Sequence, residues 1–68
     1  MDRITFEDWR IDEVRSGAPL TTEERMFLVK DTPRFEECSY SAEDLLAMSD
    51  ADLMSAAYGV WAEYVSGM

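Results

Sequence analysis

The sequence predicts a small all-α protein: a bundle of four short helices, about 6–16, 22–30, 42–48 and 50–66, with a helical turn at 33–38. Two observations support this class. Four stretches carry residues that begin helices, and apolar residues after them recur at spacings of three and four. The single candidate for a strand, 26–29, lies inside a helical window and is too short to build a sheet. We therefore expect one helical domain over residues 1–68.

The clearest helix-start signal is a six-residue pattern that occurs twice, as YSAEDL and, eight residues later, as MSDADL. In each copy a serine precedes an aspartate by three residues, Ser41 with Asp44 and Ser49 with Asp52. A serine oxygen in this place accepts a hydrogen bond from a free amide of the first turn, and the acid reaches back toward the serine amide. The acid also favours the positive end of the helix dipole.

Looser versions of the same signal predict the two helices of the first half. The first helix follows a cap at Thr5 and ends before Gly17, a residue suited to the position after a helix. The second follows a cap at Thr21. Arg25 occupies the helical position at which an apolar residue often packs against the residue before the cap. Pro33 disfavours helix at the residue before it and suits the first position of a short turn.

Two caps eight residues apart predict a short helix over 42–48, a sharp corner, and a new helix that begins at Asp50. The alternative is one continuous helix over 42–66 with Ser49 and Asp50 on its surface. We favour the corner because both copies of the pattern carry a cap.

The predicted helix over 50–66 is the longest and least polar, and its apolar residues fall on two faces. One face carries Leu53, Val60 and Tyr64, and the other carries Met54, Tyr58, Trp61 and Val65. A helix that is apolar nearly all round is usually buried on both sides. Either the other helices wrap it, or one face meets another molecule. Gly59 within it costs roughly 1 kcal/mol of helix stability relative to alanine.

Charge is the strongest compositional signal, with a formal net charge of −9. Residues 1–34 carry eight acids and six bases, a net of −2, whereas residues 35–68 carry seven acids and no Lys or Arg, a net of −7. Nucleic-acid binding depends on Lys and Arg that neutralise phosphates, so direct binding of nucleic acid is not expected. A basic protein surface fits better as a partner. Solubility alone is the alternative explanation.

The residues of common enzyme sites are missing from the composition. Without histidine, the usual general base and the usual nucleophile pairs are gone. The single cysteine, Cys38, cannot form an internal disulfide and suits a reducing compartment. The longest weakly charged run, 53–65, is too short to span a bilayer, and the N-terminus lacks a signal peptide pattern. We expect a non-enzymatic cytoplasmic protein that uses no cofactor, no metal and no membrane.

Two surfaces are therefore candidates for binding a protein partner. The first is the acidic second half, with Glu36, Glu37, Glu43, Asp44, Asp50, Asp52 and Glu63. With no base among them, these carboxylates can imitate the phosphate path of a nucleic acid; the alternative is that they are solvated helix caps. The second is the aromatic face of the last helix, with Met54, Tyr58 and Trp61. Trp and Tyr are frequent at interface hot spots, but they are also ordinary core residues of a small protein.

In size, acidity and lack of catalytic residues, the chain resembles the small inhibitors that bacteriophages encode against host enzymes and defences, a group that includes anti-CRISPR proteins and DNA mimics. The resemblance is one of overall profile. It implies a phage or mobile-element protein, acting in the host cytoplasm, that covers a basic nucleic-acid-binding surface of a host complex. The alternative function is a structural or adaptor module whose last helix docks on a partner or on its own twin in a homodimer.

Overall fold

The structure is a computed structural model that describes residues 9–67. Its elements are α1 (Ile11–Arg15), α2 (Thr22–Asp31), the 3-10 helix η1 (Thr32–Arg34), α3 (Ala42–Leu46) and α4 (Asp50–Ser66). Residues 9–67 contain no β-strand. The predicted all-α class is confirmed, and the bounds of α4 agree with the predicted range of 50–66.

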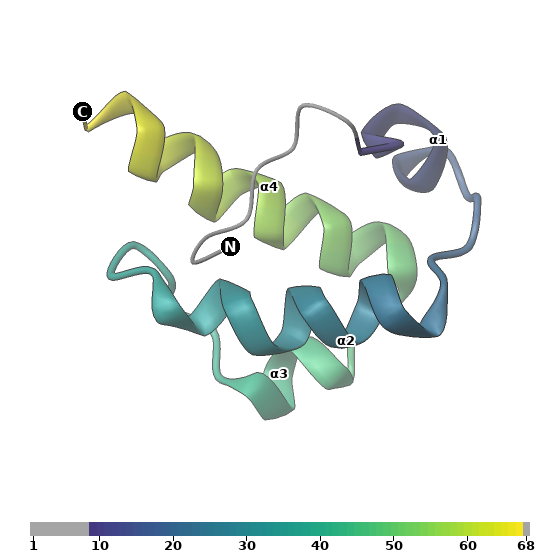
Figure 1. Ribbon diagram of the computed structural model, residues 1–68, viewed down its shortest axis with the longest axis horizontal. Helices are drawn as coiled ribbons and strands as arrows, with labels where there is room; N and C mark the ends of the chain where they lie inside the picture. Colours follow the sequence, from purple (N-terminus) through teal and green to yellow (C-terminus); the bar gives the residue numbers. More distant parts are fainter. Residues whose placement is uncertain (1–8, 68) are drawn as a thin grey trace.

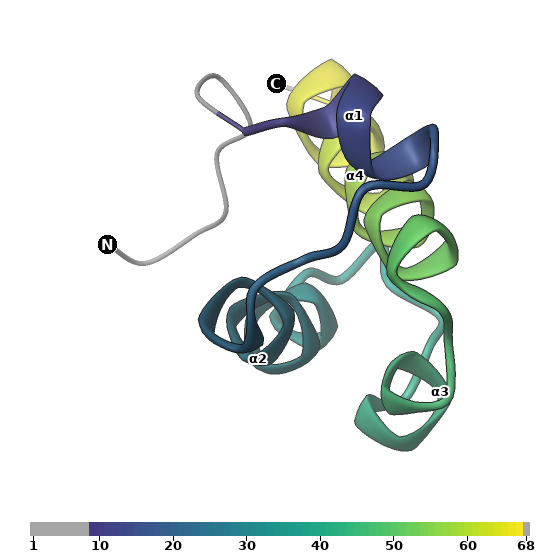
Figure 2. The same cartoon turned by 90° about the vertical axis from the view of Figure 1, so that its right-hand side faces the viewer.

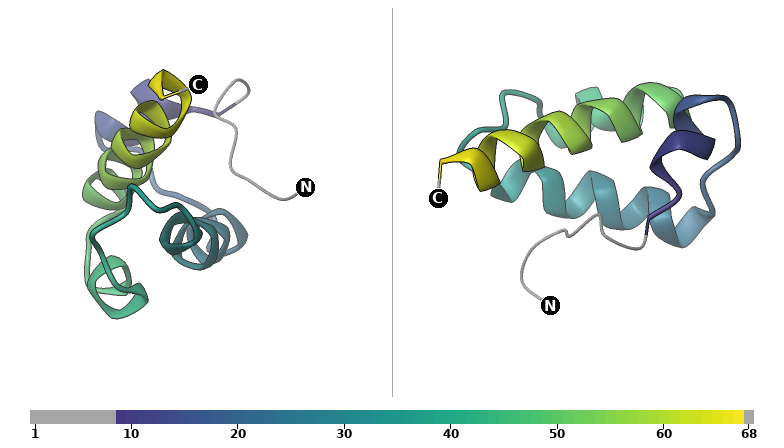
Figure 3. Two further views of the ribbon diagram at one scale, coloured as in Figure 1. Left: turned by 90° about the vertical axis from the view of Figure 1, so that its left-hand side faces the viewer. Right: turned by 90° about the horizontal axis from the view of Figure 1, so that it is seen from above.

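α4 is the central element of the bundle. It runs beside α2, with α1 on one side of it and with α2 and α3 on the other (Figures 1 and 2). α2 and α4 run in the same direction, and α3, which follows α2 in the chain, runs back the opposite way (Figures 1 and 3). As a result, the N-termini of α2 and α4 lie at one end of the molecule, together with the C-terminus of α3.

The hydrophobic core forms along the inner side of α4. Its buried members are Val14, Leu28, Val29, Phe35, Leu45, Leu53, Met54, Ala57 and Val60. Two ring contacts close the edges of this core. Trp9 stacks on Phe27 with ring centroids 6.1 Å apart, and Phe35 meets Tyr64 edge to face at 5.0 Å. The apolar side chains of α4 are therefore packed mainly against the other elements of the same chain.

Side-chain caps begin α2 and α3 as the sequence predicted. The amide of Glu24 donates to Thr21 Oγ1 at 3.1 Å, and the amide of Thr21 donates to Glu24 Oε1 at 2.9 Å. Ser41 and Asp44 form the same reciprocal pair, at 3.1 and 3.2 Å. Because this geometry depends only on residues three apart, it can be read directly from the sequence.

The corner between α3 and α4 is also confirmed. α3 ends at Leu46, and Ser49 caps α4 by accepting a hydrogen bond from the amide of Asp52 at 3.2 Å. Ser49 has extended backbone angles, φ −65° and ψ 165°, which a continuous helix would not allow. The repeated pattern in the sequence therefore marks two helices with separate directions.

Three predicted bounds differ from the structure by two residues or more. α1 begins at Ile11, because Trp9 and Arg10 are not helical; Thr5 and residues 6–8 lie outside the described part of the chain. η1 ends at Arg34 instead of extending to residue 38, since Phe35 turns to an extended conformation and buries its ring. α3 ends two residues early, before the corner. In each case a tertiary contact or the corner overrides local helix preference.

Candidate partner-binding surface

Arg25 joins three segments of the chain where α2, α3 and α4 meet. Its guanidinium forms an ion pair with Asp50, with Nη1 2.6 Å from Oδ1, and donates to the carbonyl of Leu46 at 2.9 Å and to that of Met48. The other carboxylate oxygen of Asp50 accepts from the amide of Leu20 at 3.0 Å. Arg25 thus satisfies carbonyls that the end of α3 leaves free, and it fixes the corner before α4.

This junction corrects one part of the acidic-half prediction. Asp50 was expected to belong to an acidic surface without bases, but it is half-buried and paired with Arg25. The base comes from the first half of the chain, 25 residues away. Asp50 is therefore a structural residue of the helix junction.

The other six acids of the second half remain on the surface. They are Glu36 and Glu37 after η1, Glu43 and Asp44 in the first turn of α3, Asp52 in the first turn of α4, and Glu63 near its end. None of the six forms an ion pair with a base of residues 9–67. The carboxylate of Asp44 is used in the α3 cap, so five of these acids make no side-chain contact among those described.

Two of the five bases of residues 9–67 form ion pairs with acids of the first half, and Arg25 pairs with Asp50. Arg10 pairs with Glu24 at 2.9 Å and Glu13 at 3.6 Å, and Arg34 pairs with Asp31 at 3.1 Å. The surface charge is therefore not averaged over the molecule, and the second half presents uncompensated negative charge.

The ion pair and the α2 cap both act on Glu24. The hydrogen bond from the Thr21 amide is the main cause that lowers the pKa of Glu24 below its ordinary value of 4.5. Burial opposes it, and the Arg10 guanidinium and the Thr21 side chain lower the pKa further. Glu24 is therefore charged at neutral pH, as the α2 N-terminus favours.

The aromatic-face prediction is only partly compatible with the structure. Met54 is 0% exposed and belongs to the core, so it is not accessible to a partner. Tyr58 and Trp61 are half-buried, with ring centroids 5.8 Å apart, and the Arg15 guanidinium lies 5.9 Å from the Tyr58 ring. α1 covers this side of α4, so these residues do not form an open apolar face.

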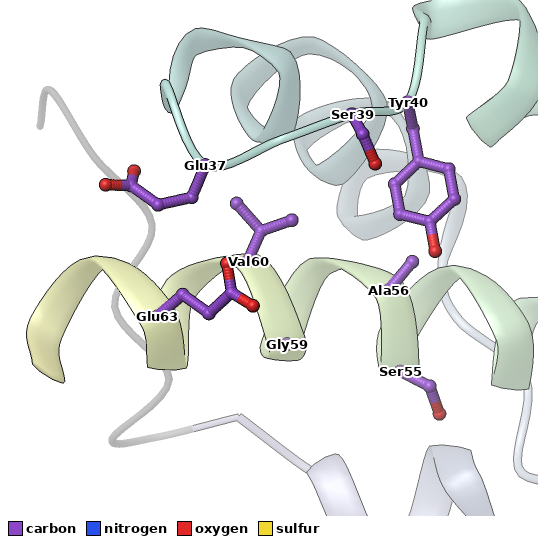
Figure 4. Close-up of a pocket in the computed structure, with 8 residues that line it drawn as sticks. All are labelled: Glu37, Ser39, Tyr40, Ser55, Ala56, Gly59, Val60 and Glu63. Carbon is purple, nitrogen blue, oxygen red and sulfur yellow. The ribbon is translucent and has the colours of Figure 1, made fainter.

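A surface groove runs along the opposite, exposed side of α4. Two adjoining pockets form it, of about 230 and 380 Å³, which share Tyr40, Ser55 and Ala56. We call it the α4 groove. Its floor is formed by Ser55, Ala56, Gly59 and Val60 of α4, and its wall is the segment 37–40 (Figure 4). The Cys38 thiol donates to the Tyr40 carbonyl at 3.4 Å, which helps to fix that wall.

Three of the predicted acids line this groove, and the others do not. Glu37 and Glu63 line one end, and Asp52 lines the other. In Figure 4 the carboxylate of Glu63 points back along α4 toward Gly59, whereas Glu37 extends from the wall with its carboxylate turned away from Glu63. Glu36, Glu43 and Asp44 are not among the groove residues. The structure therefore brings together three acids that the sequence separates by up to 26 residues.

Most groove residues were not predicted as site residues, among them Tyr40, Ser55 and Gly59. Tyr40 is 39% exposed, with its hydroxyl end toward α4 beside Ala56 (Figure 4). Gly59 was noted only for its helix cost. The sequence does not show that the space around Gly59 is open: a Cβ added there would meet no atom within 4 Å.

Two further polar atoms are buried near the end of α2. Asp31 Oδ2 and Thr32 Oγ1 have no hydrogen-bond partner among the described residues, and the two residues are 4% and 0% exposed. The other oxygen of Asp31 accepts from Arg34. Neither residue lines the α4 groove, and a buried polar atom without a partner weakens the core locally.

The described residues show no other type of site. Within 9–67, no cluster of three or more Cys, Asp or Glu side chains is placed to hold a metal ion. Over the same residues, no helix has both the length and the hydropathy that crossing a membrane requires. Comparison of the chain with protein families, with curated proteins and with solved structures finds no match. The surface acids and the α4 groove are thus the features from which a function can be argued.

Proposed function

We propose that the protein is a non-enzymatic binding protein that covers a basic surface of a protein partner. The observation that supports this most strongly is the set of surface acids after residue 34, none of which pairs with a base of residues 9–67. A fold stabilised by its surface charges would intersperse both signs, as Arg10 and Glu24 do. Instead the acids gather on α3, the start of α4 and the 36–37 loop, where they can complement a positively charged surface.

The natural basic surface of this kind is one that binds nucleic acid. Such surfaces carry Lys and Arg in the spacing of phosphates, and an acidic protein that occupies them competes with the nucleic acid. The size and charge profile resemble those of phage-encoded inhibitors, which act in this manner. The proposal is therefore an inhibitor or regulator, of phage or mobile-element type, of a nucleic-acid-handling complex in the host cytoplasm.

A pair of matched variants tests the proposal. In Glu36→Gln/Glu43→Gln, two exposed acids of the second half lose their charge; in Asp12→Asn/Glu23→Gln, two exposed acids of the first half do. Both variants change the net charge by the same amount, and none of the four side chains has a hydrogen bond or ion pair among the described contacts.

Each tagged protein is used to capture partners from bacterial lysate over a range of salt concentrations, and the captured proteins are assayed for nucleic-acid binding. We expect a basic partner that is lost as salt rises, because screening weakens exposed charge pairs. It should be released from nucleic acid by the wild type and by the first-half variant, and less by the second-half variant. Equal release by both variants, or a partner retained at high salt, would contradict the proposal.

A further inference from the structure

The α4 groove has features that the fold itself does not require. Gly59 lies in the middle of a helix, where glycine is less favourable than alanine, yet the space above it is empty. Packing within the chain does not explain the glycine, since an alanine Cβ would fit there without contact. A glycine of this kind is useful where another molecule approaches the helix backbone closely.

The charges at one end of the groove are also unfavourable for the isolated protein. Glu63 is in the last turn of α4, where the partial charge of the helix C-terminus is negative and where cations are stabilising. No basic residue occupies that last turn, and Glu37 adds a second carboxylate from the groove wall. This end of the groove therefore gathers three sources of negative charge with no base of residues 9–67 to offset them.

An aromatic ring flanks the same space. Tyr40 lines both pockets, between the end that holds Glu37 and Glu63 and the end that holds Asp52. Unlike the aromatic residues beside the core, it is 39% exposed and is not among the side chains packed against the core. The groove thus combines carboxylates, an accessible ring and a floor of short side chains.

We propose that the α4 groove binds an arginine side chain carried by a segment of the basic partner. A guanidinium forms paired hydrogen bonds with carboxylates and stacks on aromatic rings, and its alkyl stem packs on apolar surface. Glu63 would bind the guanidinium, with Glu37 adding negative charge from the wall. The stem would lie along Gly59 and Ala56, beside the Tyr40 ring (Figure 4). Lysine offers a point charge without the planar group, so it uses fewer of these features.

Charge decides between a partner protein and a second copy of this chain. Each copy carries a net charge of −9, and the groove is acidic at both ends. A second copy would bring the same sign of charge to the groove. The inference rests on the proposed function, because it assigns to one place on the acidic surface the recognition of a basic partner.

The test uses two synthetic probes, a flexible glycine–serine peptide bearing a few arginines and its twin with lysines, titrated into the full chain by calorimetry at low salt. Gly59→Leu fills the groove from its floor, and the open space around Gly59 allows the fold to be retained. Glu37→Gln and Glu63→Gln remove groove charges. Glu36→Gln and Glu43→Gln remove the same charge from exposed positions outside the groove.

We expect the arginine peptide to bind more tightly than its lysine twin. Gly59→Leu and Glu63→Gln should each weaken binding of the arginine peptide by about tenfold. Glu36→Gln and Glu43→Gln remove charge from the wider acidic surface outside the groove, so each should weaken it by only about twofold. Gly59→Ala should raise the melting temperature and still weaken binding, which separates binding from stability. If Gly59→Leu does not fold, Glu37→Gln paired with its neighbour Glu36→Gln makes the same comparison.

Two other results are informative in different ways. If groove and outside variants weaken binding equally, and arginine and lysine peptides bind alike, the groove is not the site, while binding through the acidic surface stands. If neither peptide binds at low salt, both this inference and the proposed function are wrong.

Discussion

Replacement of Arg25 by methionine tests the helix junction most directly. Methionine keeps a long, flexible stem and a comparable helix propensity, so the change removes mainly the guanidinium. The variant loses the ion pair with Asp50 and the hydrogen bonds to the Leu46 and Met48 carbonyls. It leaves the Leu20 amide on Asp50 in place.

The size of the effect follows from the exposure of these groups. The side chains of Arg25 and Asp50 are 27% and 32% exposed, so their ion pair contributes about 1 kcal/mol, near the upper end for surface pairs. The two carbonyl contacts with a charged donor add about 1–2 kcal/mol together, since water replaces part of what is lost at the exposed Leu46 carbonyl. The expected loss is therefore about 2–3 kcal/mol.

That loss is large for this protein. A chain of 68 residues is typically stable by about 3–10 kcal/mol, so Arg25→Met should lower the melting temperature by about 10–20 °C. Urea unfolding followed by far-UV circular dichroism measures the change in the free energy of unfolding. Lys30→Met, at an exposed position of the same helix, is the control and should stay within about 0.5 kcal/mol. A loss below about 0.5 kcal/mol for Arg25→Met would refute the assignment of the junction.

Three further changes test other contacts of the fold by the same unfolding measurement. Ser49→Ala removes the α4 cap and should cost about 1 kcal/mol; an unchanged stability would mean that water replaces the cap. Thr32→Val replaces a buried hydroxyl that has no partner among residues 9–67 and should stabilise by about 1 kcal/mol, and a loss would show that this hydroxyl is satisfied. The pKa of Glu24 is lowered on folding, so its contribution is complete above its ordinary value of 4.5 and is lost as pH falls through the lower pKa of the folded state. Glu24→Gln should therefore flatten the decline of stability below pH 4.5, and an unaltered decline would contradict this cause.

The parts of the fold that could be predicted from the sequence depend on residues close together in the chain. The caps at Thr21, Ser41 and Ser49 each need only a side chain and an amide three residues on, and all three are present. α4 was predicted with the observed bounds because its cap and its apolar spacing agree. The start of α1 was not predicted, because Trp9 stacks on Phe27, a contact that no local pattern contains.

The candidate site was harder to predict because its residues come from distant segments. Arg25 was noticed only as a departure from the cap pattern, and its partner Asp50 is in another helix. Met54 shares helical spacing with Tyr58 and Trp61, but spacing does not tell which edge of an apolar face a neighbouring helix covers. Glu37 and Glu63 form one end of a groove only because the chain turns after η1 and returns beside α4.

The Arg25 junction also has a kinetic consequence. α3 has five residues, too few to persist as an isolated helix, and Leu45 alone among them is buried. Its amides are therefore expected to exchange with solvent through a local opening, while those in the middle of α4 wait for global unfolding. Tyr40 and Met48 flank α3 and line the groove, so each such opening is expected to move two of its lining residues. A single guanidinium on α2 thereby sets how often the groove changes its shape.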